Sequence, residues 1–168
     1  DDNIKILFED KDWKILDTNY NYYRSNYADQ KIIIDEIEYP IVADSIDGLT
    51  KNQKALLGNN LRIYCDNGVL TLSSSRENIH YDDKTQDWLK NKFDEILKSV
   101  TTIYQTEINK KSSYLEAVNY YFEIFNKFEY YHNSNVLIDF VPYYNGDEII
   151  KIISLNSFGI SNFEIKKY

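Results

Sequence analysis

The fold is decided by residues 82–131, which read DDKTQDWLKNKFDEILKSVTTIYQTEINKKSSYLEAVNYYFEIFNKFEYY. In the first half of this stretch, apolar residues recur at steps of three and four, a spacing that places them on one face of an α-helix. We therefore predict an amphipathic helix over residues 84–108, capped by Asp83 with Gln86 three positions later. The apolar face consists of Leu89, Phe93, Ile96, Leu97, Val100, Ile103 and Tyr104.

A second helix is predicted over residues 114–131. Ser113 and Glu116 fit the Ser-x-x-Glu capping box, in which each side chain pairs with an otherwise unpaired backbone N–H group. The connector, residues 109–112, is short and polar, and this favours an antiparallel pair of helices. The apolar face of the second helix consists of Leu115, Val118, Phe122, Phe125 and Phe128.

Two Asn-Gly pairs predict β-hairpins on either side of the helices, because a type I′ turn requires positive φ at both positions. They are Asn67-Gly68, within residues 61–72, and Asn145-Gly146, between strands 136–143 and 148–155. Tight turns join antiparallel strands, so the predicted fold is α+β, with an antiparallel sheet of about six to eight strands packed against the helix pair. Further strands are expected at residues 4–8, 13–16, 31–39 and 158–165, and a short helix at 51–57 that ends at Gly58.

Length and composition indicate a single domain. The chain has 168 residues, 43% of them apolar, and no linker-like segment, so residues 1–168 are expected to share one core. The sequence contains no apolar run long enough to span a membrane. Cys65 is the only cysteine, which precludes an internal disulfide and favours a reducing, cytoplasmic location. The chain begins Asp1-Asp2 without methionine, so a removed signal peptide is the alternative.

The acidic charge narrows the class of partner. The formal net charge is −8, and only three arginines are present, which disfavours binding to the phosphate backbone of nucleic acids. An acidic surface attracts basic proteins and accelerates their association. No residue spacing matches a motif for a metal or a cofactor, so neither is expected.

The leading hypothesis is a noncatalytic protein-binding module, such as an inhibitor or immunity-type protein that blocks a basic surface. Tyrosines supply rigid contact area at interfaces, and the segment from residue 20 to 27 is rich in them. The candidate binding residues are Tyr20, Tyr22, Tyr23, Tyr27, Asp82 and Asp83.

The sequence is also compatible with two other functions. His80 and His132 flank the helix pair, whose two ends an antiparallel arrangement brings together, so they could form an enzyme site with Asp82. Such a site would suit a hydrolase or phosphoesterase-like reaction, because His132-Asn-Ser134 supplies one His-x-Ser element, although His80 lacks the same pattern. Cys65 alternates with Leu61 and Ile63 on a strand and is expected to pack rather than to react. The third possibility is an extracytoplasmic ligand-binding domain whose signal has been removed.

Overall fold

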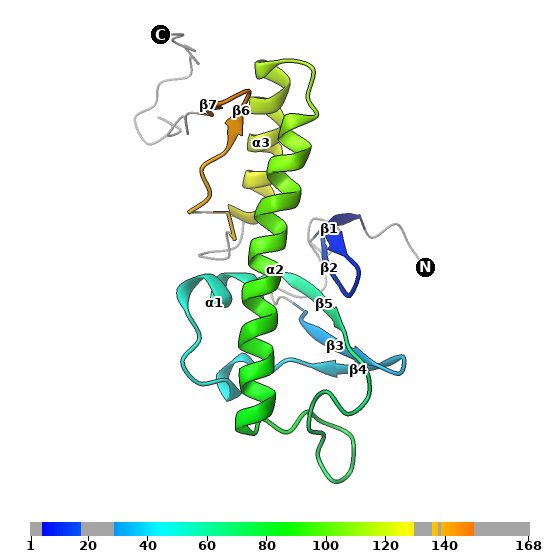
Figure 1. The fold of residues 1–168 in the computed structure, drawn as a ribbon. Helices are drawn as coiled ribbons and strands as arrows, with labels where there is room; N and C mark the ends of the chain where they lie inside the picture. The colour runs from blue at the N-terminus through cyan, green and yellow to red at the C-terminus, as the bar shows by residue number, and fades with distance from the viewer. Residues whose placement is uncertain (1–4, 18–28, 130–135, 138, 150–168) are drawn as a thin grey trace.

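A computed structural model describes residues 5–17, 29–129, 136–137 and 139–149. Within these residues the fold is α+β, as predicted, with a five-stranded sheet, three α-helices and a small two-stranded hairpin (Figure 1). None of the described helices is long and apolar enough to cross a membrane.

The sheet is mixed rather than antiparallel. Its order is β1-β2-β5-β3-β4, and β3 and β5 run parallel while the other neighbours are antiparallel. The predicted all-antiparallel sheet is therefore wrong at this pair. After β4 the chain crosses over through a 3-10 turn and α1 before it inserts β5 beside β3, and such a crossover permits parallel pairing. The elements are β1 (Ile6–Asp10), β2 (Trp13–Leu16), β3 (Lys31–Ile34), β4 (Ile37–Pro40), η2 (Ala43–Ser45), α1 (Lys51–Leu57) and β5 (Asn60–Tyr64).

The single strand predicted over residues 31–39 is instead a hairpin. Asp35 and Glu36 have φ angles of 50° and 68°, the positive values of a type I′ turn, and they join β3 to β4. Two acidic residues at these positions lack the Asn-Gly signature, so the turn was not recognised in the sequence. The register pairs Ile32 with Tyr39 across the buried face of the sheet.

The hairpin predicted around Asn67-Gly68 does not form. Gly68 has a φ of 85°, but Asn67 is not in the positive-φ region, so the turn is not type I′. Both edges of β5 are already occupied, by β2 and β3, so the following segment has no ladder to join. Instead, Leu72 forms an isolated antiparallel bridge with Ile79.

The Asn145-Gly146 hairpin does form, with φ angles of 52° and 90°. Its strands are only two residues long, β6 (Tyr143–Tyr144) and β7 (Asp147–Glu148), so the predicted strand over 136–143 is wrong for most of its length. The side chain of Gln105 pairs with the main chain of Tyr143, accepting from its N–H at 3.0 Å and donating to its carbonyl at 2.6 Å. The expected return strand beyond residue 149 and the last strand at 158–165 lie outside the described residues.

Both predicted long helices are confirmed, as α2 (Asp83–Asn109) and α3 (Tyr114–Glu129). Asp82 rather than Asp83 caps α2, because the Asp82 carboxylate accepts the Thr85 N–H at 2.8 Å. The short helix α1 is also confirmed, with Gly58 as its C-cap.

The capping box of α3 forms with one partner displaced by a residue. The Glu116 N–H donates to the Ser113 hydroxyl at 3.3 Å, as the pattern predicts. The Glu116 carboxylate, however, accepts the N–H of Ser112 at 3.0 Å and also its hydroxyl at 2.7 Å. These bonds hold the connector between the helices against the first turn of α3.

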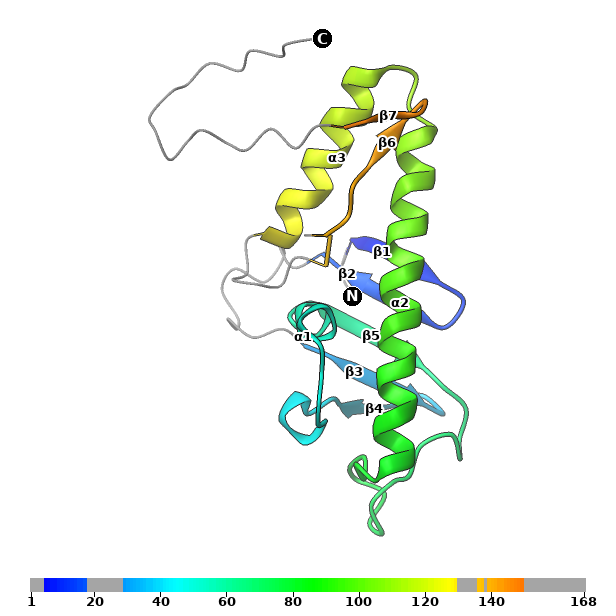
Figure 2. The ribbon, with the colours of Figure 1, turned by 60° about the vertical axis from the view of Figure 1, so that its left-hand side comes forward.

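Helix α2 is the longest described helix, and it contacts both the sheet and α3. Its N-terminal half lies with α1 over one face of the sheet, and its C-terminal half extends beyond the sheet, where α3 runs back beside it (Figures 1 and 2). The β6–β7 hairpin lies against these two helices at the same end of the molecule. The predicted antiparallel helix pair is therefore present, but among the described helices it is α1 and α2 that cover the sheet.

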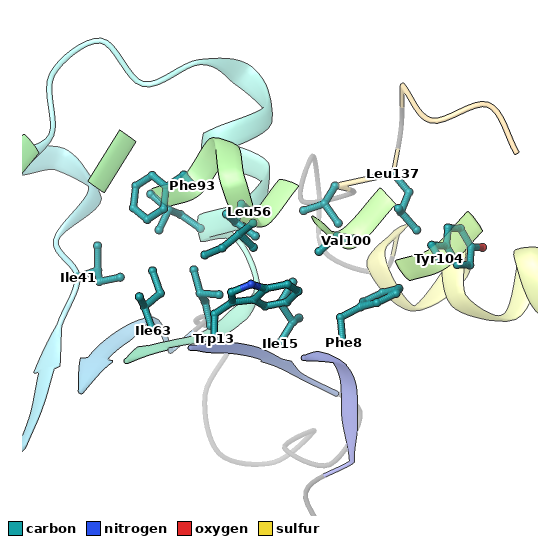
Figure 3. Close-up of a cluster of buried hydrophobic side chains, with 14 of the residues drawn as sticks. Phe8, Trp13, Ile15, Ile41, Leu56, Ile63, Phe93, Val100, Tyr104 and Leu137 are labelled. Carbon is teal, nitrogen blue, oxygen red and sulfur yellow. The ribbon is translucent and has the colours of Figure 1, made fainter. Parts of the chain in front are cut away.

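One continuous apolar core joins the two halves (Figure 3). Trp13 and Ile63 of the sheet, Leu56 of α1 and Phe93 of α2 are all almost fully buried. Tyr104, which is fully buried, extends this core towards α3. Its ring contacts the rings of Phe8, Tyr120, Tyr121 and Phe140, at centroid distances of 5.4–6.0 Å. Removal of such apolar surface from water is the main force that stabilises the fold.

Candidate functional site

Two segments far apart in the sequence meet at the N-terminal end of α2. The Val42 N–H donates to the Tyr81 hydroxyl at 2.7 Å, and the Asp47 N–H donates to the Gln86 side-chain oxygen at 2.8 Å. Ile46, buried in the core, anchors the same loop. The contacts bring four exposed carboxylates to one end of the molecule, which we name the acidic end: Asp44, Asp47, Asp83 and Asp87.

None of these four carboxylates forms an ion pair within the described part of the chain. Several other acids in the described part of the chain are neutralised locally. Asp12, for example, pairs at 2.6 Å with Lys92, a side chain of α2 that is only 7% exposed. Unpaired carboxylates at the acidic end therefore keep their charge available to a partner, whereas paired ones contribute little to the field outside the protein.

Asp82 lies beside the acidic end, and its carboxylate caps the N-terminus of α2. Hydrogen bonds from the Thr71 hydroxyl and from the N–H and hydroxyl of Thr85 lower the pKa of its carboxyl to about 2 from an ordinary value of 3.8. Thr85 is fully buried, and its hydroxyl accepts the Thr71 N–H at 3.1 Å, so the cap also fixes the loop before α2. Asp82 thus caps α2, and its role in binding, which the sequence suggested, stays a prediction.

Asp82→Ala is expected to lower the stability of the fold at pH 7, because it removes the cap of α2. Since the folded-state pKa is depressed, the stabilisation is complete above about pH 4 and is lost as the pH falls towards 2. Urea unfolding of the wild type and the variant between pH 2 and 7 measures the difference. We expect the difference in free energy of unfolding between the wild type and the variant to be constant from pH 5 to 7 and to disappear between pH 4 and 2. Asp83→Ala is the neighbouring control, and an equal loss in that variant would contradict the assignment of the cap.

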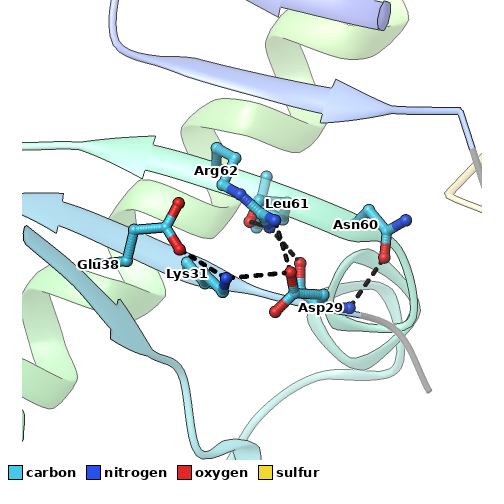
Figure 4. Close-up of polar contacts among 6 residues, drawn as sticks. All are labelled: Asp29, Lys31, Glu38, Asn60, Leu61 and Arg62. Carbon is cyan, nitrogen blue, oxygen red and sulfur yellow. Dashed lines mark hydrogen bonds and ion pairs between the residues drawn. The ribbon is translucent and has the colours of Figure 1, made fainter. Parts of the chain in front are cut away.

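The face of the sheet opposite α2 carries a balanced polar network (Figure 4). Arg62 of β5 donates to the main-chain carbonyl and the carboxylate of Asp29, and Lys31 of β3 bridges Asp29 at 3.3 Å and Glu38 at 2.6 Å. The pairing with Glu38 raises the pKa of Lys31. Two cations and two carboxylates cancel, so this network is better suited to holding the sheet together than to attracting a charged partner.

Of the predicted enzyme site, the described residues include His80 and Asp82. His80 is exposed, and its main-chain N–H donates to the Thr71 carbonyl at 2.8 Å, while the Asp82 carboxylate caps α2. His132 lies outside the described residues, so the meeting of the two histidines stays a prediction. Within the described ranges, no group of three or more histidine, cysteine or acidic side chains is arranged to hold a metal ion.

The other predicted binding residues have different outcomes. Asp83 is exposed at the acidic end, as the binding hypothesis requires. The tyrosine-rich segment with Tyr20, Tyr22, Tyr23 and Tyr27 lies outside the described residues.

Cys65 packs against the core at the end of β5, as its alternation with Leu61 and Ile63 predicted. It is half-buried, and burial, aided by the nearby carboxylates of Asp66 and Asp12, raises the pKa of its thiol to about 11. The thiol is therefore protonated at neutral pH, which is the opposite of what a nucleophilic cysteine needs.

Sequence reasoning missed Asp44, Asp47 and Asp87 as members of the site. Asp87 follows the helix period, but a charged residue on the outer face of a helix is an ordinary solvated side chain. Asp47 lies 39 residues before Gln86, the residue of α2 whose side chain it contacts, and Asp44 lies three residues earlier still. Nothing local in the sequence indicates that their loop returns to the start of α2.

Comparison with known proteins finds no matching family model, and no curated protein or solved structure with significant similarity to this chain. The chemistry of the site therefore has to be inferred from its own residues.

Proposed function

We propose that the protein is a noncatalytic binding module whose acidic end occupies a basic surface of a protein partner, as a small inhibitor or an immunity-type protein would. The observation that supports this is the convergence of four exposed, unpaired carboxylates from two segments onto one fixed end of the molecule. The helix dipole favours acids in the first turn of α2, which accounts for Asp83. It does not account for Asp44 and Asp47, which belong to another segment.

The proposed mechanism is electrostatic steering followed by steric occupation. Like charges gathered at one end repel one another, and the cationic surface of a partner relieves that repulsion. Val42, 47% exposed in the same loop, adds apolar contact beside the carboxylates. Hydrogen bonds already hold the loop and the helix together, so little conformational entropy is lost when a partner binds. The compartment that we propose is a reducing one, because the single cysteine is a free, half-buried thiol that packs against the core.

The test uses a pair of variants with equal charge. Asp44→Asn, Asp47→Asn and Asp87→Asn together remove three charges from the acidic end and leave the first helical turn intact. Glu9→Gln, Glu36→Gln and Asp147→Asn remove three charges from β1, the β3–β4 turn and β7, all at exposed positions. Both variants have a net charge of −5, from −8 plus three. Tagged wild type and both variants serve as baits for capture from native lysate at 50 and 500 mM salt, with mass spectrometry of the retained proteins.

We expect the wild type and the control variant to retain the same basic protein in stoichiometric amount at low salt and to release it at high salt. The acidic-end variant is expected to retain at least about tenfold less, because each desolvated interfacial charge contributes about 1–2 kcal/mol. Equal retention by the two variants would assign binding to net charge and remove the acidic end as the site. No salt-sensitive basic partner on any bait would contradict the proposed function itself.

A further inference from the structure

A groove of about 600 Å³ runs along the C-terminal half of α2. One wall is the start of α1, one is α2 from Leu97 to Thr106, and one is the segment that precedes β6. Apolar side chains line its floor, among them Leu97, Val136 and Phe140. The volume falls within the range of sites that hold a small molecule or a few residues of a peptide.

Most of the polar side chains that line this groove offer a ligand only hydrogen-bond acceptors, and the exposed amide of Asn52 is the lining group that also offers donors. The hydroxyls of Thr101 and Thr102 both donate to the Lys98 carbonyl at 2.9 Å, and that of Thr106 donates to the Thr102 carbonyl at 2.8 Å. Each hydroxyl has one proton, so only its oxygen lone pairs remain for a ligand. The side-chain NH2 group of Gln105 donates to the Tyr143 carbonyl and to the Asn109 side-chain oxygen, so both of its N–H bonds are used.

One negative charge lies at the wall of the groove. Asp139 lines it, is exposed, and forms no ion pair within the described part of the chain. The same residue also lines an adjoining hollow of about 160 Å³, whose wall includes the exposed carboxylate of Glu148. No lysine or arginine lines either hollow among the described residues. An apolar floor, acceptor oxygens and unpaired carboxylates together complement a cation carried on an aliphatic stem.

We propose that this groove binds the side chain of a lysine or arginine in an extended segment of a partner protein. The methylene stem lies on Leu97 and Phe140, and the ammonium or guanidinium group donates to Asp139 and to the threonine oxygens. A side chain with a free carboxylate is disfavoured, because Asp139 repels it and the threonine hydroxyls offer it only acceptors. Asp139→Asn keeps the shape of the side chain and removes the charge, so it isolates this interaction.

The groove is separate from the acidic end, and the proposal does not depend on it. Thr101 follows Asp87 by 14 residues in the same helix, a rise of roughly 21 Å at 1.5 Å per residue. A variant neutralised at Asp44, Asp47 and Asp87 is therefore expected to bind the groove ligand as the wild type does, so failure of one proposal is distinguishable from failure of the other.

The experiment is an NMR titration of the labelled protein with blocked tripeptides of sequence Gly-Lys-Gly and Gly-norleucine-Gly, and with n-butylamine. Norleucine keeps the aliphatic stem of lysine and lacks its charge. We expect the lysine peptide to shift the amide signals of Thr101, Thr102, Thr106 and Phe140. Binding of the norleucine peptide to the wild type, and of the lysine peptide to Asp139→Asn, is expected to be at least about tenfold weaker.

Three outcomes would overturn the proposal. Equal affinities for the lysine and norleucine peptides would remove the recognition of a cation. Shifts confined to the acidic end would place the cation there and not in the groove. If n-butylamine binds as tightly as the lysine peptide, the groove recognises a free amine and the assignment to a protein segment is wrong.

Discussion

Leu89→Ala is expected to reduce the free energy of unfolding by about 3–5 kcal/mol, one of the two largest effects that we predict for single substitutions in this fold. Leu89 is 0% exposed at the point where α2 crosses the sheet, so truncation leaves a cavity in addition to losing the transfer free energy of the side chain. The same substitution at Leu115 in α3 is the matched control. Leu115 is 55% exposed, and we expect Leu115→Ala to lower the free energy of unfolding by less than about 1 kcal/mol.

Urea unfolding followed by far-UV circular dichroism measures both variants. Domains of this size have total stabilities of about 5–15 kcal/mol, so Leu89→Ala is expected to move the midpoint visibly or to prevent folding at 37 °C. Equal losses at Leu89 and Leu115 would mean that α2 does not lie on the sheet with its apolar face as described.

Tyr104→Ala is expected to reduce the free energy of unfolding by about 3–5 kcal/mol, because Tyr104 joins the sheet to the outer half of the molecule. Its ring contacts Phe8 of β1 on one side and Tyr121 of α3 on the other, and its hydroxyl donates to the Tyr121 carbonyl. Tyr104→Phe keeps the ring and removes only the hydrogen bond. We expect that variant to cost about 0.5–1.5 kcal/mol, the usual net value of one such bond.

Amide hydrogen exchange distinguishes a junction from an ordinary core residue. In Tyr104→Ala, amides of α3 are expected to exchange faster than those of β5, because the outer half loses its contact with the sheet. In Tyr104→Phe the two elements are expected to keep their relative protection. Uniform acceleration of all amides in Tyr104→Ala would contradict the view that this residue couples two halves.

The helices were predictable from sequence because their information is local. The apolar period from Leu89 to Tyr104 fixes the buried face of α2, and the Ser113–Glu116 pattern fixes the start of α3. The errors are single-residue displacements at the caps. Asp82 caps α2 in place of Asp83, and the N–H of Ser112 rather than that of Ser113 pairs with the Glu116 carboxylate. Adjacent residues with the same polar groups compete for a cap, and tertiary contacts such as that of Thr71 with Thr85 decide between them.

The sheet was less predictable because its pairing is not local. The Asn145-Gly146 turn formed where its sequence indicated, whereas Asn67-Gly68 lacked a free strand edge to close against. Asp35-Glu36 forms a type I′ turn without the usual residues, because the pairing of β3 with β4 and the burial of Tyr39 hold it there. The pairing of neighbouring strands therefore outweighs intrinsic turn preference: it prevents a hairpin at Asn67-Gly68 and permits one at Asp35-Glu36.

Of the acidic end, sequence reasoning identified Asp83 alone. Asp44 and Asp47 belong to the segment between β4 and α1. Its position depends on two hydrogen bonds, to Tyr81 and Gln86, that connect it to the start of α2. Such contacts have no signature in the sequence, because the donors are main-chain N–H groups that every residue except proline possesses.

The central claim is that the acidic end steers a basic partner, and the association rate constant tests it most directly. Stopped-flow mixing of the captured partner with the wild type, the acidic-end variant and the control variant is measured from 20 to 500 mM salt. We predict that the acidic-end variant associates about 10- to 100-fold more slowly than the wild type at low salt, with a flatter dependence on salt, and that the control variant stays close to the wild type. Identical rates and salt dependences for the two variants would contradict the account.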